Sequence, residues 1–243
     1  LRGAVASILG QSMPDFELIA VDDGSRDGSL AYLQSLADPR VYVLATPPRG
    51  LTRALNHGLG ACRSPLIARL DADDTMRADR LARQCAYMDT HPEVGLLGSA
   101  AWEVGRGGRV LVAPPETDAE LRRALAVRNP FVHSSVMFRR SVMACCGPYD
   151  ESFRVAQDYD LWLRMAQVTR LACLPYPLVT RLRHGASVSS LHPWARRWAQ
   201  LRAQVRAYGW HAIARLPITV FMSTLTKRAI PYGTDTYGDI ALA

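Results

Sequence analysis

The first 100 residues alternate between short apolar runs, which are typical of strands, and longer segments with the periodicity of helices. This alternation predicts strands at residues 16–21, 41–44, 66–70 and 94–98, and helices at residues 2–9, 27–36, 51–61 and 78–90. Because strands that alternate with helices form βαβ units, we expect an α/β fold whose mostly parallel central sheet is flanked by helices. A chain of 243 residues is long enough for one such domain with an appendage.

The pattern loosens after residue 100. It predicts a Gly/Arg hairpin at 105–109, a helix near 117–127, a strand near 135–138, a helix after Asp158 and an apolar segment at 171–179. The composition changes again after about residue 191. We therefore predict a domain at 1–190 and a helical extension at 191–243.

The extension is basic and amphipathic. Residues 161–234 contain eleven Arg or Lys and no Asp or Glu, and the whole chain has a net charge of +7. Apolar residues recur there at helical spacing, at Trp194, Trp198, Leu201, Val205 and Tyr208. This pattern fits a helix that packs on the domain and equally fits one that docks on an anionic membrane through residues 194–230. We expect no nucleic-acid partner, because the aromatic residues follow a helical stripe without a recognised nucleic-acid motif.

The cysteines and the apolar runs indicate the compartment. Five cysteines, two of them adjacent and none in a Cys-x-x-Cys spacing, argue against a disulfide framework and against a thiolate zinc site. No apolar run reaches the roughly 20 residues that span a bilayer. We therefore expect a cytoplasmic protein, whose membrane contact, if any, is peripheral and at the inner face of the cell membrane.

Three carboxylates follow the expected strand at 66–70. Asp71, Asp73 and Asp74 lie within four residues, and like charges at a strand end are unfavourable unless a cation neutralises them. A divalent metal with oxygen ligands would do so, with Asp71 and Asp73 converging on a sugar and a metal. The alternative is a solvated turn in which Asp74 caps the helix that begins near Ala78.

A second acidic pair, Asp22 and Asp23, ends the expected strand at 16–21. Ligands of open α/β sheets bind at the carboxyl edge of the strands, so two acidic strand ends predict one electronegative cleft. There, a carboxylate of this pair would accept hydrogen bonds from a nucleobase or a ribose. The alternative is an ordinary turn after a strand.

Further candidates lie in the second half of the chain. Asp158 and Asp160 begin a predicted helix, where they either complement the helix dipole or place one carboxylate to take a proton from a hydroxyl. His133 and His184 lie in polar, turn-like segments. Each is either a hydrogen-bonding residue or a group that completes the coordination sphere of a metal.

Taken together and in order, these segments resemble the family 2 glycosyltransferases, which are inverting enzymes with the GT-A nucleotide-diphospho-sugar transferase fold. The resemblance extends from residue 1 to about residue 190. It rests on the motifs Ser7-Ile8-Leu9-Gly10-Gln11-Ser12, Phe16-Glu17-Leu18-Ile19-Ala20-Val21-Asp22-Asp23-Gly24-Ser25, Gly50-Leu51-Thr52-Arg53-Ala54-Leu55-Asn56-His57-Gly58, Leu70-Asp71-Ala72-Asp73-Asp74, His133-Ser134-Ser135-Val136-Met137-Phe138-Arg139-Arg140, Gly147-Pro148-Tyr149-Asp150-Glu151 and Asp158-Tyr159-Asp160-Leu161-Trp162-Leu163-Arg164.

The resemblance implies roles for the donor-binding residues. Asp23 would read the nucleobase, with Asp22 beside it. Asp71 would contact the ribose or the sugar, and Asp73 would hold Mn²⁺ or Mg²⁺ on the diphosphate of a nucleotide-sugar donor. His184 would approach this metal.

The resemblance also implies the reaction. Asp158 would deprotonate a hydroxyl of a glycan or lipid-linked acceptor, which displaces the nucleoside diphosphate directly and inverts the anomeric carbon. The product would be part of a cell-surface polysaccharide. His133 lies in a matching motif that gives it no defined role.

The sequence departs from the family pattern in three places. The family's first strand has no counterpart before the helix at 2–9, so we expect a domain that lacks this strand at its N-terminus. Gln157 stands where many members have Glu, and Arg181-Leu182-Arg183 replaces an aromatic-Arg pattern before His184. Two alternatives stay open, a truncated and catalytically inactive GT-A-like binding module and a nucleotidyltransferase of similar fold.

Overall fold

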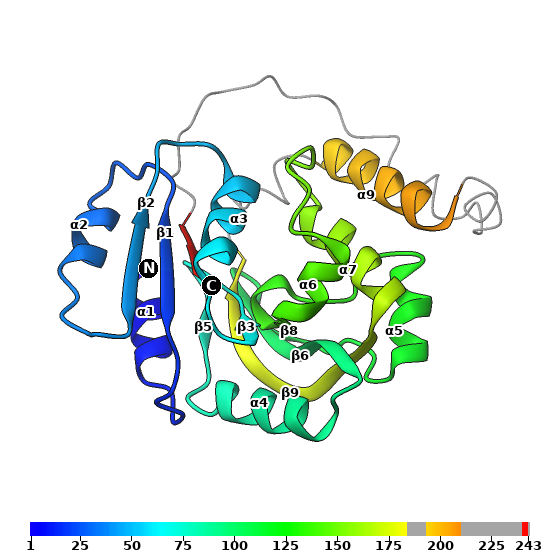
Figure 1. Ribbon diagram of the computed structural model, residues 1–243, viewed down its shortest axis with the longest axis horizontal. Helices are drawn as coiled ribbons and strands as arrows, with labels where there is room; N and C mark the ends of the chain where they lie inside the picture. Colours follow the sequence, from blue (N-terminus) through cyan, green and yellow to red (C-terminus); the bar gives the residue numbers. More distant parts are fainter. Residues whose placement is uncertain (184–192, 210–239, 243) are drawn as a thin grey trace.

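The strands form two sheets that meet in the segment 66–71 (Figure 1). The structure is a computed structural model that describes residues 1–183, 193–209 and 240–242. The first sheet has the order β2 (Val41–Ala45), β1 (Leu18–Asp22), β10 (Ile240–Leu242) and β4 (Leu70–Asp71). The second has the order β3 (Leu66–Ala68), β8 (Met137–Arg139), β6 (Val94–Gly105), β9 (Arg170–Leu182) and β5 (Thr75–Met76), with β7 (Gly108–Val112) paired to β6. Only Arg69 separates β3 from β4, so one strand path belongs to both sheets.

Helices flank these sheets, as the sequence predicts. They are α1 (Arg2–Leu9), α2 (Ser29–Gln34), α3 (Leu51–Ala61), α4 (Arg80–Thr90), α5 (Asp118–Leu125), α6 (Arg140–Cys146), α7 (Gln157–Val168) and α9 (Pro193–Tyr208), with a 3₁₀ turn, η1 (His133–Ser135). In Figure 1, α2 and β2 lie at one end of the molecule, and α5 and α7 lie at the other. None of the helices in the described ranges is long and apolar enough to cross a membrane.

The strand directions differ from the expected mostly parallel sheet. Among the described strands, the pairs β1–β2 and β6–β9 are parallel and the other pairs are antiparallel. The βαβ alternation holds for β1, β2 and β4, which run in the same direction, with α2 and α3 in the connections between them. Further along, a tight hairpin joins β6 to β7, so this pair is antiparallel.

The predicted extension contains both a helix and a strand. Residues 193–208 form α9, which packs on α7, whereas β10 lies in the first sheet between β1 and β4. The sequence analysis predicted a helical extension for residues 191–243 and did not identify this strand. The division of the chain at 190/191 remains a prediction.

Burial on both faces explains why β1 is an uninterrupted apolar run. All five residues of β1 are buried, as expected for an inner strand that is covered by helices. One of the largest fully buried side chains, Trp162 of α7, lies in the same core cluster as Ala54 and Leu55 of α3. Its ring packs edge-on against Phe131. This packing fixes the N-terminus of α7, where Asp158 lies.

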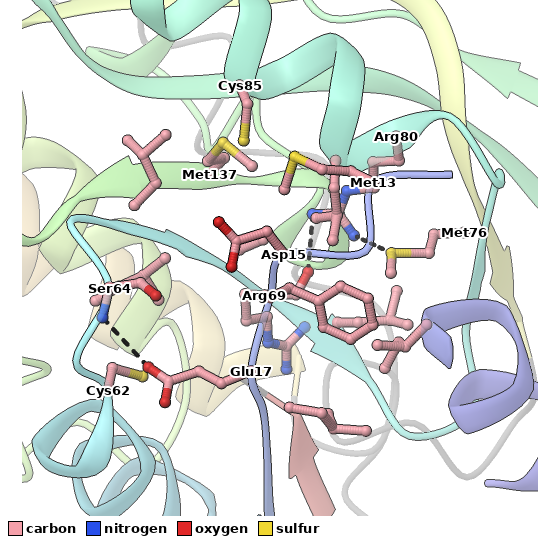
Figure 2. Close-up of a pocket in the computed structure, with 18 of the residues that line it drawn as sticks. Met13, Asp15, Glu17, Cys62, Ser64, Arg69, Met76, Arg80, Cys85 and Met137 are labelled. Atoms are coloured by element: carbon pink, nitrogen blue, oxygen red, sulfur yellow. Dashed lines mark hydrogen bonds between the residues drawn. The ribbon is translucent and has the colours of Figure 1, made fainter. Parts of the chain in front are cut away.

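A cavity of about 340 Å³ lies between β1 and β3 (Figure 2). β10 pairs with β1 only along residues 20–22. The cavity lies beside the earlier part of β1, which β10 does not reach. The wall is mainly apolar, and it includes Leu18, Leu66 and Met137. Arg69 and Arg80 also border the cavity, but none of the predicted active-site residues in the described part of the chain does.

Candidate active site

The two acidic strand ends lie at the same edge of the first sheet. β10 runs antiparallel to both β1 and β4, so β1 and β4 run in the same direction. Asp22 is opposite Ile240 and Asp71 is opposite Ala241. Asp22 and Asp71 therefore flank β10, two strand spacings or about 10 Å apart. This is the arrangement that the sequence analysis predicted for the carboxyl edge.

The second cluster holds three carboxylates that face one point. Each of Asp71, Asp73 and Asp74 offers an oxygen, and the three oxygens lie within 4.8 Å of one another. Asp73 is exposed and Asp71 is partly exposed, whereas Asp74 is 1% exposed. Carboxylate oxygens are the ligands that hard divalent cations prefer, so the donor set fits Mg²⁺ or Mn²⁺. Asp71 and Asp73 are the two that a cation can reach from solvent.

A buried arginine sets the charge state of Asp71. The guanidinium of Arg69 forms an ion pair with Asp71. Burial opposes the charge of Asp71, but Arg69 outweighs it and lowers the pKa of this carboxyl to about 2. Asp71 is thus an anion at every physiological pH, which is the state that a metal ligand needs.

Asp74 has the opposite environment. Burial, reinforced by the charge of Asp71 and then of Asp73, raises the pKa of Asp74 to about 7. Its carboxylate accepts hydrogen bonds from the hydroxyl of Ser134 and from the backbone N–H of Leu182 (3.0 Å). The alternative role of Asp74 as a helix cap is therefore wrong. Asp79 is the N-cap residue of α4 instead, and its side chain makes no capping hydrogen bond.

Asp22 and Asp23 are both buried, but their oxygens are used differently. The carboxylate of Asp23 accepts hydrogen bonds from the backbone N–H groups of Arg49 (2.8 Å) and Gly50 (2.6 Å) and from the hydroxyl of Thr46 (3.2 Å). It thereby ties β1 to the loop before α3.

Asp22 keeps an acceptor available. Its Oδ2 accepts from the backbone N–H of Ser25 (3.2 Å), whereas Oδ1 has no hydrogen-bond partner within the described part of the chain. The Ser25 hydroxyl is likewise buried without a partner there. Orphaned buried polar atoms at a sheet edge indicate a ligand site, because leaving them unpaired is costly.

Asp158 is held in place at the start of α7. Its Oδ2 accepts from the side-chain amide of Asn129 (2.7 Å), and its Oδ1 accepts from the backbone N–H of Tyr159 (2.8 Å). The preceding Ala156 has a φ of 60°, in the left-handed region that costs a residue with a Cβ about 1 kcal/mol. Strained backbone of this kind clusters at functional sites.

The charges of Asp158 and Asp71 both act on the buried phenol of Tyr149. Burial raises the pKa of its phenol; the charge of Arg69 opposes the rise, and the charges of Asp158 and Asp71 both add to it. Tyr149 therefore lies in the field of both carboxylates. Its hydroxyl is 2.8 Å from Nε2 of His133, whose pKa burial lowers well below the usual value. His133 is thus a neutral hydrogen-bonding residue beside the site.

Sequence reasoning missed several residues of this site. Ser134 and Arg69 contact Asp71 directly, and Asn129 contacts Asp158. An arginine inside an otherwise apolar strand was the available signal for Arg69, because a buried guanidinium needs an acidic partner. His184 lies outside the described residues, and its role as a metal ligand remains a prediction.

The acidic carboxyl edge is consistent with a site for a nucleotide ligand, and comparison with known proteins shows the family. The family model described as "Glycosyl transferase family 2" matches residues 1–147. The chain belongs to this family, and the resemblance inferred from the motifs is confirmed.

Curated relatives agree. The chain is 32% identical over 213 residues to the amylovoran biosynthesis glycosyltransferase AmsE of Erwinia amylovora, an alignment that covers 86% of this chain and 78% of AmsE. It is 30% identical over 169 residues to the O-antigen biosynthesis glycosyltransferase WbnJ of Escherichia coli, covering 67% of this chain and 65% of WbnJ.

Solved structures show the GT-A fold. TarS 1–349 of S. aureus in complex with UDP-GlcNAc superposes with a TM-score of 0.68 at 19% identity, over 86% of this chain and 64% of that one. The mannosyltransferase PcManGT of Pyrobaculum calidifontis, in complex with GDP-Man and Mn²⁺, superposes with a TM-score of 0.59 at 18% identity, over 84% and 59% of the two chains. The chain therefore spans less than two thirds of these structures.

Proposed function

We propose that this glycosyltransferase moves a sugar from a nucleotide-sugar donor to a glycan or lipid-linked acceptor, with inversion at the anomeric carbon, during the synthesis of a cell-surface polysaccharide. The observation that carries the proposal is the gathering of Asp22, Asp71 and Asp73 at one sheet edge, with Asp158 in the field of the same tyrosine as Asp71. The names of the relatives support the polysaccharide, and the ligands of the two neighbours support the donor class.

The donor base would bind at Asp22 rather than Asp23. Both carboxylate oxygens of Asp23 accept hydrogen bonds from the protein, whereas Oδ1 of Asp22 has no hydrogen-bond partner among the described residues. Uracil, thymine and guanine each have a ring N–H group, and this carboxylate can accept a hydrogen bond from it. The neighbouring Ser25 hydroxyl offers a second polar contact, so a nucleobase at this position would satisfy both buried groups.

The diphosphate would lie over Asp71 and Asp73. A divalent cation bound by these carboxylates, Mn²⁺ or Mg²⁺, would neutralise the negative charge that develops on the departing diphosphate. The protein's own part is to keep Asp71 ionised through Arg69 and to hold it next to Asp73.

Asp158 would act as the base. Its carboxylate takes the proton of the acceptor hydroxyl while that oxygen forms a bond to the anomeric carbon, and the bond from this carbon to the diphosphate oxygen breaks. The electron pair leaves with the nucleoside diphosphate. A single displacement inverts the anomeric carbon without a covalent glycosyl-enzyme. The side-chain amide of Asn129 donates to Oδ2 of Asp158 and thereby helps to fix the orientation of this carboxylate.

The orientation of α9 supports the proposal of a peripheral membrane contact. Trp194 is 46% exposed and Trp198 is 67% exposed on the same side of the helix, whereas Ala203 and Gln204 face the domain. Gln204 donates to the backbone oxygen of Ala126 (3.0 Å). The tryptophan side therefore faces away from the domain, in a helix rich in arginine, and we propose that it rests on the anionic inner face of the cell membrane. The rest of the predicted 194–230 contact lies mostly outside the described residues.

Vesicle co-sedimentation tests the membrane contact. A W194A/W198A variant should lose retention on vesicles of phosphatidylglycerol and phosphatidylcholine, whereas Tyr176→Ala, an exposed aromatic on β9, should keep it. Equal retention of the three proteins, or no retention of the unaltered protein, would refute this contact.

Transfer assays with product analysis test the reaction. We expect NMR of the product to show the anomeric configuration opposite to that of the donor, and Asp158→Asn to lower kcat by about 10²–10⁴-fold. Nucleotide binding by this variant should be unchanged, because Asp158 contacts the acceptor. Retention of configuration, or full activity of Asp158→Asn, would contradict the mechanism.

A further inference from the structure

The Ser134 hydroxyl lies at the centre of the acidic cluster. It belongs to η1, which approaches the end of β4 from a distant part of the chain, and it is 1% exposed. It accepts hydrogen bonds from Nη1 of Arg69 (3.2 Å) and from the backbone N–H of Asp71 (3.2 Å). It also lies 2.9 Å from Oδ2 of Asp71 and within hydrogen-bonding distance of Oδ2 of Asp74.

The number of protons defines what this hydroxyl does. A serine hydroxyl has two lone pairs and one proton. Both lone pairs are used by the two N–H donors, so the single O–H proton is shared between Oδ2 of Asp71 and Oδ2 of Asp74. The hydroxyl is therefore fixed from two sides and holds Oδ2 of Asp71 from within the protein.

The other oxygen of Asp71 is fixed by a buried cation. Arg69 is 3% exposed, and its Nη2 contacts Oδ1 of Asp71. Arg80, fully buried, donates to the backbone oxygen of Arg69 (3.0 Å) and through Nε to the side chain of Gln84 (2.9 Å). The bond from Arg80 fixes the backbone of Arg69, so the guanidinium of Arg69 meets Asp71 in a defined geometry.

We infer that Ser134 and Arg69 are positioning residues, which hold Asp71 in the orientation from which it joins Asp73 around the divalent cation. The inference rests on the proposed function, because it assigns the cation to Asp71 and Asp73. Hydrogen-bond partners of metal ligands set ligand orientation, and their loss lowers metal affinity by about 10–100-fold. Neither residue contacts the donor or the acceptor in this role.

The adjacent serine provides a matched control. Ser135 is fully buried. Its hydroxyl donates to the backbone oxygen of Val132 (2.8 Å) and accepts from the backbone N–H of Ser99 (3.3 Å). It contacts no carboxylate in these bonds. Ser135→Ala therefore removes a buried hydroxyl from the same turn without touching Asp71.

Electron paramagnetic resonance of Mn²⁺ gives a readout that does not depend on turnover. We expect Ser134→Ala to bind Mn²⁺ about 10–100-fold more weakly than the unaltered protein, and Ser135→Ala to bind it equally well. Ser134→Cys keeps the volume but is a weak hydrogen-bond partner, so it should also bind weakly and covers the case in which Ser134→Ala does not fold. Arg69→Lys, which keeps the charge but loses the fork geometry, should lower the affinity as well.

The outcomes separate this inference from the proposed function. If the unaltered protein binds no Mn²⁺, the metal-assisted function fails and the positioning role fails with it. If the unaltered protein binds Mn²⁺ and both Ser134 variants bind it within twofold, the function stands and the positioning role is refuted. A loss of equal size in Ser134→Ala and Ser135→Ala would also refute it, because the effect would then come from the turn as a whole.

Discussion

We propose that Asp22 binds the donor base, whereas Asp23 ties β1 to the loop before α3. The same isosteric change, Asp to Asn, at each position tests these two roles. In Asp23→Asn, an NH₂ group replaces one carboxylate oxygen and faces the N–H of Arg49 or Gly50, so a charge-assisted hydrogen bond is replaced by two opposed donors. Such a bond contributes about 1.5–3 kcal/mol. Arg49 and Gly50 are exposed, so water recovers part of this loss, and we expect a destabilisation of roughly 2 kcal/mol.

Asp22→Asn should have the opposite profile. The amide oxygen can still accept from Ser25, and the NH₂ group takes the place of Oδ1, which has no partner among the described residues. The free energy of unfolding should change by less than about 1 kcal/mol. The NH₂ group would oppose the ring N–H of the donor base, so nucleotide affinity should fall by about 10–100-fold.

Thermal unfolding and titration calorimetry with nucleoside diphosphates separate the two roles. In a chain of this size about 1 kcal/mol shifts Tm by about 2–4 °C, so Asp23→Asn should lower Tm by roughly 4–8 °C and Asp22→Asn by little. If Asp23→Asn unfolds like the unaltered protein and loses nucleotide affinity while Asp22→Asn keeps it, the assignment of the base to Asp22 is wrong and Asp23 reads the base.

Three further changes test the packing and the charges. Ala156→Gly should raise Tm by about 2–4 °C, since glycine adopts a φ of 60° without the cost of about 1 kcal/mol that alanine bears; an unchanged or lower Tm would show that the backbone is not strained there. Gly98→Ala should cost about 1–3 kcal/mol in denaturant unfolding, because its Cβ would lie 2.7 Å from the ring of Phe131, whereas Gly107→Ala, with open space around it, should cost less than about 0.5 kcal/mol. The hydrogen bond from Ser152, together with Arg206, outweighs the effect of burial and lowers the pKa of Asp150 to about 2. The ionised carboxylate therefore stabilises the folded state above the unfolded pKa near 4, and this contribution is lost as the pH falls towards 2. Asp150→Asn should thus be less stable by about 1–2 kcal/mol at pH 7 and equal to the unaltered protein near pH 2, and a gap that persists at pH 2 would contradict this linkage.

Local periodicity predicts the elements whose residues contact their own neighbours in sequence. The bounds of α1 and α3 agree with the expected helices at 2–9 and 51–61, and β1 and β2 lie within one or two residues of the expected strands. The strand β9 (Arg170–Leu182) is longer than the apolar segment expected at 171–179. Its pairing with β6 continues through Arg181 and Leu182. β10 has no local signal at all, since three residues become a strand only through two distant partners.

The same limit applies to the site. Asp71, Asp73 and Asp158 are visible in the sequence because each stands at the end or the start of an apolar run. The contacts that define their chemistry come from remote segments. Ser134 is 63 residues from Asp71, and the loop that occupies Asp23 is 26–27 residues away, so neither partner can be read from the local pattern.

Binding of nucleotide-sugars in the presence and absence of Mn²⁺ tests the central claim most directly. Titration calorimetry with UDP-, GDP- and dTDP-sugars should find at least one donor whose binding requires the metal, and Asp73→Asn should abolish that requirement together with most of the affinity. The Mn²⁺ concentration should be about 10⁻³ M, so that even a weak cation site is occupied. If no donor binds under these conditions, the account is contradicted. Tight binding that neither the metal nor Asp73→Asn affects would also contradict it.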